Sequence, residues 1–336
     1  MALRGSGMRL LVTGGAGYIG AHFVAAALDA GISDIVVVDD LSTGLRRRVP
    51  DEVKFHQLDL ATDSAVQDLA TILDEDRIDA VVHFAAKKAV GESVDQPELY
   101  FRSNVGATIN VLSAMRSSGV SALIFSSSAA VYGEPSTAVV YEDTPCLPIN
   151  PYGQSKRISE LALANAVTAW GLKAVSLRYF NVAGARDSQL ADTTTTNLMP
   201  AVREVITRGT RLAVFGDDYP TPDGTCVRDY VHVLDLVDAH LTALERIGRD
   251  ADPGLHTYNV GTGQGSSVLE IVHEFRQQPG VQLDYDLRDR RAGDPASLTA
   301  NVDRIRDELG WTAQYGRDSI VASVVEHPPV TDQADG

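Results

Sequence analysis

The chain has 336 residues, enough for one large domain or two smaller ones around a sizeable hydrophobic core. A hydrophobic fraction of 44% and a charged fraction of 22% exclude a disordered protein, and no apolar run approaches the roughly 18 residues of a membrane-spanning helix. Lysine and arginine total 29 against 45 for aspartate and glutamate, so the net charge of -16 disfavours nucleic acid as a partner.

The cysteine content and the chain ends indicate the cell compartment. Cys146 and Cys226 are the only cysteines, too few for a disulfide framework, which favours the reduced cytoplasm. Residues 1–7 lack the apolar core of a secretion signal. We expect residues 1–7 and 329–336 to be flexible ends.

Short β-branched runs recur along the chain, nearly continuous in apolar character, as strands buried on both faces should be. In chain order they are residues 9–12, 35–38, 53–55, 80–84, 122–125, 174–177 and 257–260. Segments of helical length separate them: 21–30, 65–73 (with Thr62 or Asp63 as a cap), 105–117 and 155–170. This alternation predicts an α/β protein with a doubly wound parallel sheet, the Rossmann fold.

The alternation ends near residue 182, which indicates a smaller C-terminal substrate domain. Residues 186–196 and 217–224 read as surface loops, and 231–249 reads as a helix. We expect the larger domain to cover residues 8–181 and the smaller one 182–328. Segments near 227–262 should return to the first sheet.

A glycine pattern follows the first predicted strand. Gly14 allows a tight turn, Gly17 allows backbone amides to approach a pyrophosphate, and Gly20 allows the next helix to pack close to the strand. The free N–H groups at the helix N-terminus would then face the phosphates. On the glycines alone, a tight turn without a ligand remains an alternative.

An aspartate closes the second predicted strand, roughly 20 residues after the last glycine. Asp39 could accept hydrogen bonds from the adenosine ribose hydroxyls and would repel a 2′-phosphate. No arginine follows at once, so NAD is favoured over NADP. A solvated loop position fits Asp40 better than Asp39.

Tyr152 and Lys156 lie four residues apart, on one face of a helix. A phenol ionises near pH ~10 and is a poor base at neutrality, but a nearby ammonium and a positively charged nicotinamide both favour the phenolate. Ser128 could hydrogen-bond the same substrate hydroxyl and relay its proton. The alternatives are an ordinary surface pair for the tyrosine and lysine, and local capping of the strand end for the serines, which still applies to Ser127.

Together these motifs carry a family resemblance. They are residues 13–20 (TGGAGYIG), 83–93 (HFAAKKAVGES), 126–128 (SSS), Tyr152 with Lys156, 178–181 (RYFN), 197–200 (NLMP) and 227–233 (VRDYVHV). In combination they resemble the UDP-glucose 4-epimerases (UDP-galactose 4-epimerases) of the extended short-chain dehydrogenase/reductase superfamily. The likeness runs from about residue 8 to about residue 311.

The resemblance implies a reaction and roles. In this family NAD stays bound, takes the C4 hydride of the sugar and returns it to the other face of a transient 4-keto sugar. Tyr152 would then be the base, Lys156 would tune it, and Ser128 would help to move the proton. Residues 8–181 would bind NAD and residues 182–328 the UDP-sugar.

The resemblance also implies binding residues, and no metal. The remaining cofactor contacts would be Tyr18, Ile19, Asp40, Asp59, Leu60, Phe84, Ala85, Lys88, Asn104, Ser126, Tyr152, Lys156, Tyr179 and Phe180, with Lys156 holding the nicotinamide ribose. The substrate contacts would be Ser128, Tyr152, Asn181, Asn197, Leu198, Phe215, Arg228, Arg291 and Asp294. Guanidinium groups match phosphate geometry, which independently favours the two arginines as diphosphate ligands. The alternative for Arg228 is an exposed pair with Asp229.

This sequence departs from the family pattern at several positions. Ala130 replaces a frequent threonine, Lys87 replaces a frequent leucine, and the stretch after Gly184 lacks the usual Gly-Glu loop. Leu298 is intermediate in size at a position that influences tolerance of N-acetyl sugars. We expect a preference for UDP-glucose and UDP-galactose, with activity on UDP-N-acetylhexosamines left open.

Other functions compete with this hypothesis. A 4,6-dehydratase needs an Asp-Glu pair where this chain has Ala129 and Ala130. An epimerase or decarboxylase acting on another UDP-sugar is harder to exclude, and a non-catalytic NAD-binding protein would keep the same fold. By resemblance the protein is a homodimer that pairs through the helices around 105–117 and 155–170, whose apolar residues could equally be core.

Overall fold

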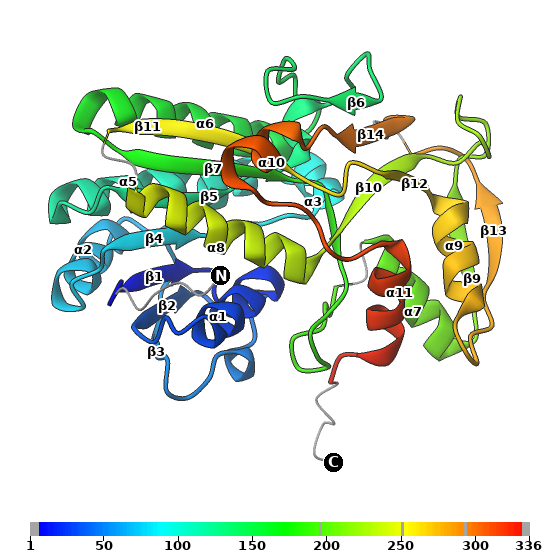
Figure 1. Cartoon of the computed structure of the whole chain (residues 1–336), viewed down its shortest axis with the longest axis horizontal. Helices are drawn as coiled ribbons and strands as arrows, with labels where there is room; N and C mark the ends of the chain where they lie inside the picture. The colour runs from blue at the N-terminus through cyan, green and yellow to red at the C-terminus, as the bar shows by residue number, and fades with distance from the viewer. Residues whose placement is uncertain (1–6, 195–196, 250–251, 292–293, 331–336) are drawn as a thin grey trace.

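The fold is built on a parallel sheet of seven strands (Figure 1), in a computed structural model that describes residues 7–194, 197–249, 252–291 and 294–330. Its order is β11-β7-β5-β4-β1-β2-β3. The strands are β1 (Leu10–Thr13), β2 (Ile35–Asp39), β3 (Lys54–Gln57), β4 (Ala80–His83), β5 (Ala122–Ser126), β7 (Lys173–Tyr179) and β11 (Gly254–Val260). Each overlaps one of the predicted runs, although residues 9, 53 and 84 lie just outside β1, β3 and β4. Every pairing is parallel, so the predicted fold class is confirmed.

Helices cover both faces of this sheet because alternate residues of each strand point to opposite sides. Leu10 and Val12 pack in one core cluster with α1 (Tyr18–Asp29) and α8 (Val233–Arg249). Leu11 packs on the other face, in a second cluster with three further helices. These are α2 (Ala65–Glu75), α5 (Ala107–Ser118) and α6 (Pro151–Trp170).

Some predicted helix limits are wrong. Residues 231 and 232 belong to a strand, and α8 begins only at Val233. Neither Thr62 nor Asp63 caps α2: Ser64 holds the N-cap position, and no side chain caps the helix. Three short helical pieces precede α5. They are α3 (Val90–Asp95), α4 (Pro97–Tyr100) and a π-helical turn (Phe101–Gly106).

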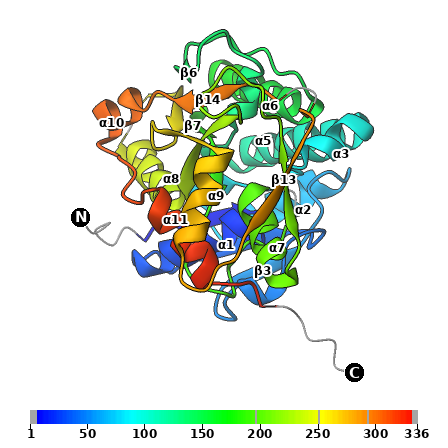
Figure 2. The same ribbon diagram turned by 90° about the vertical axis from the view of Figure 1, so that its right-hand side faces the viewer.

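A second, smaller layer stands at the carboxyl end of the large sheet (Figure 2). Its central strand β10 (Val227–His232) pairs with β8 (Asn181–Ala183), β12 (Gly265–Ser267) and β14 (Ser297–Ala300), and β14 pairs with β6 (Val139–Val140). The strands β9 (Arg211–Phe215) and β13 (Asp284–Arg288) form a separate parallel pair. The accompanying helices are α7 (Leu198–Arg208), α9 (Val268–Gln277), α10 (Asp303–Leu309) and α11 (Arg317–Glu326).

The two layers exchange strands. Strand β6 comes from the first half of the chain and pairs in the smaller layer, whereas β11 comes from the second half and lies beside β7 at the edge of the large sheet. Strand β10, near the start of the 227–262 region, lies in the smaller layer. The domain limits at 8–181 and 182–328 stay predictions, and the ends 1–6 and 331–336 lie outside the described residues. Across the described ranges, no helix is both long and apolar enough to cross a bilayer.

Candidate active site

The turn between β1 and α1 forms a cradle for an anion. Gly14 has φ +71°, and a Cβ there would lie 2.6 Å from the backbone nitrogen of Ala85. A Cβ on Gly20 would collide with the carbonyl oxygen of Gly14, so only glycine lets the helix start this close to the strand. Gly17 is the N-cap of α1 and no side chain caps the helix, which leaves its first N–H groups to an outside acceptor.

Asp39 at the end of β2 is placed to bind a ribose. Its carboxylate is buried and accepts hydrogen bonds from the backbone N–H groups of Ala16 at 3.0 Å and Leu41 at 2.8 Å, one on each oxygen. Burial raises the pKa of Asp39. Each oxygen keeps a lone pair for a further donor. Together with the glycine cradle, this donor and acceptor set fits a dinucleotide with a free 2′-hydroxyl. Asp40 is exposed, and its carboxylate accepts from the N–H of Ser42 at 2.8 Å.

The other predicted cofactor residues lie along the carboxyl edge of the sheet. Asp59 is exposed and accepts from the N–H of Ala61, whereas Leu60 is buried in the core. Phe84 directly follows β4, and its ring packs 4.7 Å from the ring of His240. Ala85 lies next to it, against Gly14.

Asn104 joins the segment after β4 to helix α6. It is buried in the π-helical turn, where its side chain accepts from the N–H of Lys87 at 2.8 Å and donates to the Lys87 carbonyl at 3.0 Å. The same amide donates to Ser155 Oγ at 2.9 Å, one helical turn from Tyr152. π-turns often occur at functional positions in helices. Lys88, just after this segment, reaches Asp192 at 3.8 Å.

Tyr152 and Lys156 lie buried on the first turns of α6. Asn150 caps this helix by accepting from the N–H of Gly153 at 2.8 Å, and Pro151 occupies its first turn. Burial raises the pKa of Tyr152, and a hydrogen bond with Ser128 acts in the opposite direction. Lys156 Nζ donates to the carbonyl of Ser126 at 2.7 Å.

Burial lowers the pKa of Lys156 to about 7, and the charge of nearby Glu160 opposes this effect. The carboxylate of Glu160 therefore favours the ammonium form of Lys156.

The serines at the end of β5 point to different partners. Ser128 Oγ accepts from the N–H of Ala130 at 3.2 Å and lines the cavity described below. Ser126 Oγ lies 2.8 Å from His240 Nε2, and His240 Nδ1 lies 2.8 Å from the carbonyl of Leu236. Because a carbonyl only accepts, the Nδ1 of His240 carries the proton, and Ser126 donates to Nε2. Burial lowers the pKa of His240 to about 4, so the ring is neutral near pH 7.

A cavity of about 280 Å³ lies between the two layers. It brings together twelve of the predicted residues: Tyr18, Ile19, Lys88, Ser128, Tyr152, Tyr179, Phe180, Asn181, Asn197, Leu198, Arg228 and Asp294. Burial strongly raises the pKa of Tyr179, which stays a neutral phenol. The start of α1, the first turns of α6 and the start of α7 therefore all border the cavity.

Several lining residues were missed by sequence reasoning. Tyr230 lies two positions from Arg228 on β10, so both project from the same face of the strand, and the two-residue period of a strand could have identified Tyr230 as a lining residue. Val90, Ile149 and Asn150 also line the cavity. Nothing in their local pattern distinguishes them, because a long-range connection brings them to the cavity.

Arg228 pairs with a partner far along the chain. Its guanidinium donates to Asp294 at 2.6 Å, so the alternative of a pair with Asp229 is wrong. Asp229 is fully buried, where it accepts from the backbone N–H groups of Thr262 at 2.8 Å, Gly263 at 3.0 Å and Ala300 at 3.2 Å. Successive strand residues point to opposite faces, which separates the two neighbours.

Phe215 and Arg291 lie together but outside the lining of the cavity. The Arg291 guanidinium carbon lies 3.9 Å from the centre of the Phe215 ring. Residues 292 and 293, in the predicted stretch 291–294, lie outside the described residues. Over the described ranges, no three His, Cys, Asp or Glu side chains gather as a metal site requires.

Comparisons with known proteins agree with this geometry. The model of the NAD dependent epimerase/dehydratase family matches residues 10–261. The UDP-glucose 4-epimerase of Azospirillum brasilense is 44% identical over 333 residues, 98% of this chain and 94% of that protein. The enzyme of the same name from Corynebacterium glutamicum is 43% identical and covers 92% of each chain.

Solved structures are similar over nearly the whole chain. A UDP-glucose 4-epimerase from Stenotrophomonas maltophila, solved with bound NAD and a formylated UDP-arabinopyranose, has a TM-score of 0.89 at 39% identity and covers 94% of this chain and 96% of that one. The enzyme from Bifidobacterium longum, in complex with NAD+ and UDP, has a TM-score of 0.87 at 36% identity. That alignment covers 95% of this chain and 97% of the other.

Proposed function

The chain belongs to the NAD dependent epimerase/dehydratase family, and we propose that it interconverts UDP-glucose and UDP-galactose at C4 with NAD as a bound cofactor. The observation that carries this proposal is the shared cavity. The uncapped N-terminus of α1, at Tyr18 and Ile19, opens into the same space as Ser128 and Tyr152. A dinucleotide held in the cradle would thus end beside an acid–base pair.

Tyr152 and Ser128 move the proton of the sugar's 4-hydroxyl in this proposal. When bound, NAD supplies a hydride acceptor and later a donor at C4 of the sugar. The phenolate of Tyr152 takes the hydroxyl proton, with Ser128 as relay, and the resulting phenol returns it after the sugar has turned. Because burial raises the pKa of Tyr152, the phenolate needs positive charge nearby, which a protonated Lys156 provides.

The reaction requires that the UDP part of the substrate binds tightly and that the sugar part binds weakly enough to turn. Arg228 and the N-terminus of α7, which no side chain caps at Asn197, both face the cavity and suit a diphosphate. Ile149 and Leu298 line the same cavity with aliphatic surface. Such surface makes no directional contact, so a keto sugar can present either face.

The lining also argues against one competing reaction. Ala129 and Ala130 stand beside Ser128 in the cavity and carry no acid or base, whereas elimination of water across C5 and C6 needs both. We therefore favour epimerisation over dehydration. Leu298 in the cavity supports a preference for UDP-hexoses over N-acetylated ones, and comparable turnover of both would contradict it.

We further propose a cytoplasmic homodimer. The apolar side chains Ile109 on α5 and Ile158 and Leu161 on α6 are 40–48% exposed, on the two helices that the family resemblance assigns to pairing. Both cysteines are free, in keeping with a reducing compartment. Light scattering tests the dimer: Leu161→Arg should yield monomers, and unchanged mass would contradict the interface.

Conversion of UDP-galactose to UDP-glucose without added cofactor tests the activity. The product is measured with a coupled UDP-glucose dehydrogenase. Turnover would support an epimerase that carries and regenerates its NAD. No turnover, even with NAD supplied, would contradict the proposal and direct attention to another UDP-sugar.

A further inference from the structure

Glu160 is a buried carboxylate on the catalytic helix that the proposed reaction does not use. It lies one turn beyond Lys156 on α6, and only 2% of it is exposed. Burying a charge costs roughly several kcal/mol, and a well-packed apolar side chain at this position would stabilise the fold equally well or better. Stability alone therefore does not explain why the chain has a carboxylate here.

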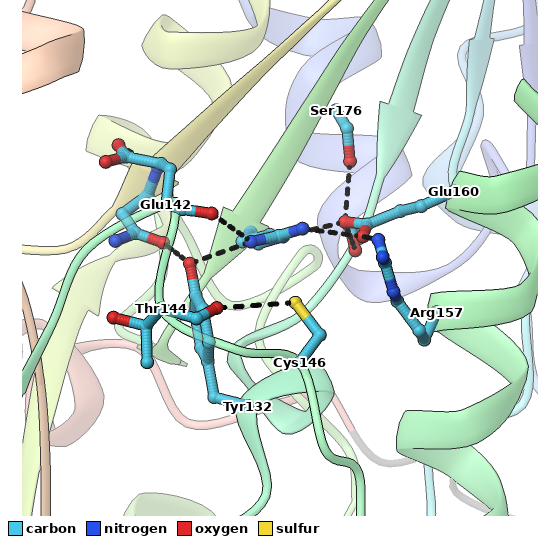
Figure 3. Close-up of polar contacts among 10 residues, drawn as sticks. Tyr132, Glu142, Thr144, Cys146, Arg157, Glu160 and Ser176 are labelled. Atoms are coloured by element: carbon cyan, nitrogen blue, oxygen red, sulfur yellow. Dashed lines mark hydrogen bonds and ion pairs between the residues drawn. The ribbon is translucent and has the colours of Figure 1, made fainter. Parts of the chain in front are cut away.

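The contacts of Glu160 are unusually complete (Figure 3). The guanidinium of Arg178 donates to both carboxylate oxygens, at 2.9 Å and 2.8 Å, and Arg157 donates at 3.2 Å. Two buried hydroxyls, Ser127 Oγ at 2.8 Å and Ser176 Oγ at 3.0 Å, donate to the same oxygen, Oε1. Hydrogen bonds to the charged form lower the pKa of Glu160 against the effect of burial, which keeps it a carboxylate.

Ser127 connects the Glu160 carboxylate to residues 126–128 at the end of β5, which we call the catalytic strand end. It lies between Ser126, whose carbonyl accepts from Lys156, and Ser128, which faces the cavity. Lys156 and Glu160, both on α6, thus hydrogen-bond to two consecutive residues, Ser126 and Ser127. Both contacts fix the distance between Ser128 and the helix that carries Tyr152.

Arg178 extends the network to the segment that borders the cavity. Its guanidinium donates to the carbonyl of Glu142 at 2.9 Å and to the hydroxyl of Tyr132 at 3.1 Å. The hydroxyl of Tyr132 in turn donates to the side chain of Asn259 on β11. Gly133, which follows Tyr132, and Ile149 both line the cavity. The network therefore joins α6, β5, β7 and β11 around the site.

We propose that Glu160 is a positioning residue for the epimerisation and that it acts through Ser127, whose hydrogen bond fixes Ser128 relative to Tyr152. This inference rests on the proposed function. It assigns a role to the middle serine of the SSS motif, which faces the network instead of the cavity. Ser127 and Glu160 touch no substrate and are not themselves catalytic.

Ser127→Ala and Ser176→Ala form a matched pair that tests this inference. Both remove one fully buried hydroxyl that donates to Glu160 Oε1, but only Ser127 lies on the catalytic strand end. The measurements are kcat and KM for UDP-galactose and the melting temperature of each variant. Misplacing a reacting group by about 1 Å can lower kcat by as much as roughly a hundredfold, so a smaller displacement should cost on the order of tenfold or more. We expect this loss in Ser127→Ala with KM unchanged, and wild-type kcat in Ser176→Ala with a similar fall in melting temperature.

The outcomes separate the two proposals. Equal kcat for both variants and the wild-type protein would overturn the role of Ser127, and so would an equal loss in both, because it would reflect general destabilisation. If Ser127→Ala does not fold, Ser127→Cys keeps the volume but offers only a weak donor and should show the same loss of kcat. An inactive wild-type protein would instead refute the proposed function, and the inference would fall with it.

Discussion

Arg228 and Asp294 form an ion pair of 2.6 Å within the cavity, although 66 residues separate them in sequence. The arginine side chain is only 10% exposed, so its charge is largely shielded from water. In the proposed function, a diphosphate bound in the cavity would compete with Asp294 for this guanidinium. Part of the binding free energy of the nucleotide would then offset the loss of the Arg228–Asp294 ion pair.

Arg228→Ala should weaken the binding of UDP on the order of 10- to 100-fold, because a charge-assisted contact contributes about 1.5–3 kcal/mol. Isothermal titration with UDP measures the effect. Arg211→Ala is the control, since Arg211 pairs with Asp286 at 2.7 Å outside the cavity lining. Unchanged affinity in Arg228→Ala would remove this arginine from the nucleotide site.

Tyr152→Phe should lower kcat by a factor of about 10² to 10⁴, the usual contribution of a general acid–base group. The substitution removes only the hydroxyl from a buried ring, so cofactor content and fold should persist. Turnover is measured together with the NAD released on denaturation. Near-normal turnover would mean that another group is the base.

Gly14→Ala should abolish retention of NAD, since its Cβ would press on the backbone of Ala85 and distort the cradle. Gly119→Ala is a close control. Gly119 has the same φ of +71° at the end of α5, but nothing lies within 4 Å of its Cβ position. Both variants carry similar backbone strain, and only Gly14→Ala should lose cofactor, measured by absorbance of the purified protein. Equal cofactor content would contradict the role of the turn.

The buried His240 should lower the free energy of unfolding at mildly acidic pH. Its folded pKa is about 4 against an ordinary value of 6.5, so between these values only the unfolded chain binds the proton. The free energy of unfolding therefore falls as pH drops through this window, by on the order of 1–2 kcal/mol between pH 7 and pH 5 from this group. Urea unfolding at both pH values measures it. His240→Gln should show a smaller pH dependence, and an equal one would contradict a buried neutral ring.

Apolar periodicity predicted the large sheet because most of its strands are buried on both faces, with the edge strand β3 as an exception. Each of the seven runs overlaps one strand of the sheet. The smaller layer was harder to predict, because strands such as β8 and β12 are only three residues long and pair with distant segments. At residues 231–232 the apolar pattern continues from strand into helix, and no local signal marks the boundary at Val233.

Motifs predicted most residues of the cavity, and the family comparisons confirm the resemblance on which many of them rested. The individual binding roles stay predictions. The sequence did not reveal which partners the buried charged side chains have. Arg228 pairs with Asp294 and not with its neighbour Asp229, and Glu160 meets Ser127 across 33 residues. Such partners depend on the packing of separate strands, which periodicity does not encode.

The central claim is that one hydride leaves C4 of the sugar and returns to the same carbon. UDP-galactose carrying deuterium at C4 tests this claim most directly, with the UDP-glucose product analysed by mass spectrometry and proton NMR. The account predicts that the product keeps its deuterium at C4 and takes none from heavy water. Loss of the label to solvent would contradict it, because C4 would then be inverted by proton exchange without bound NAD.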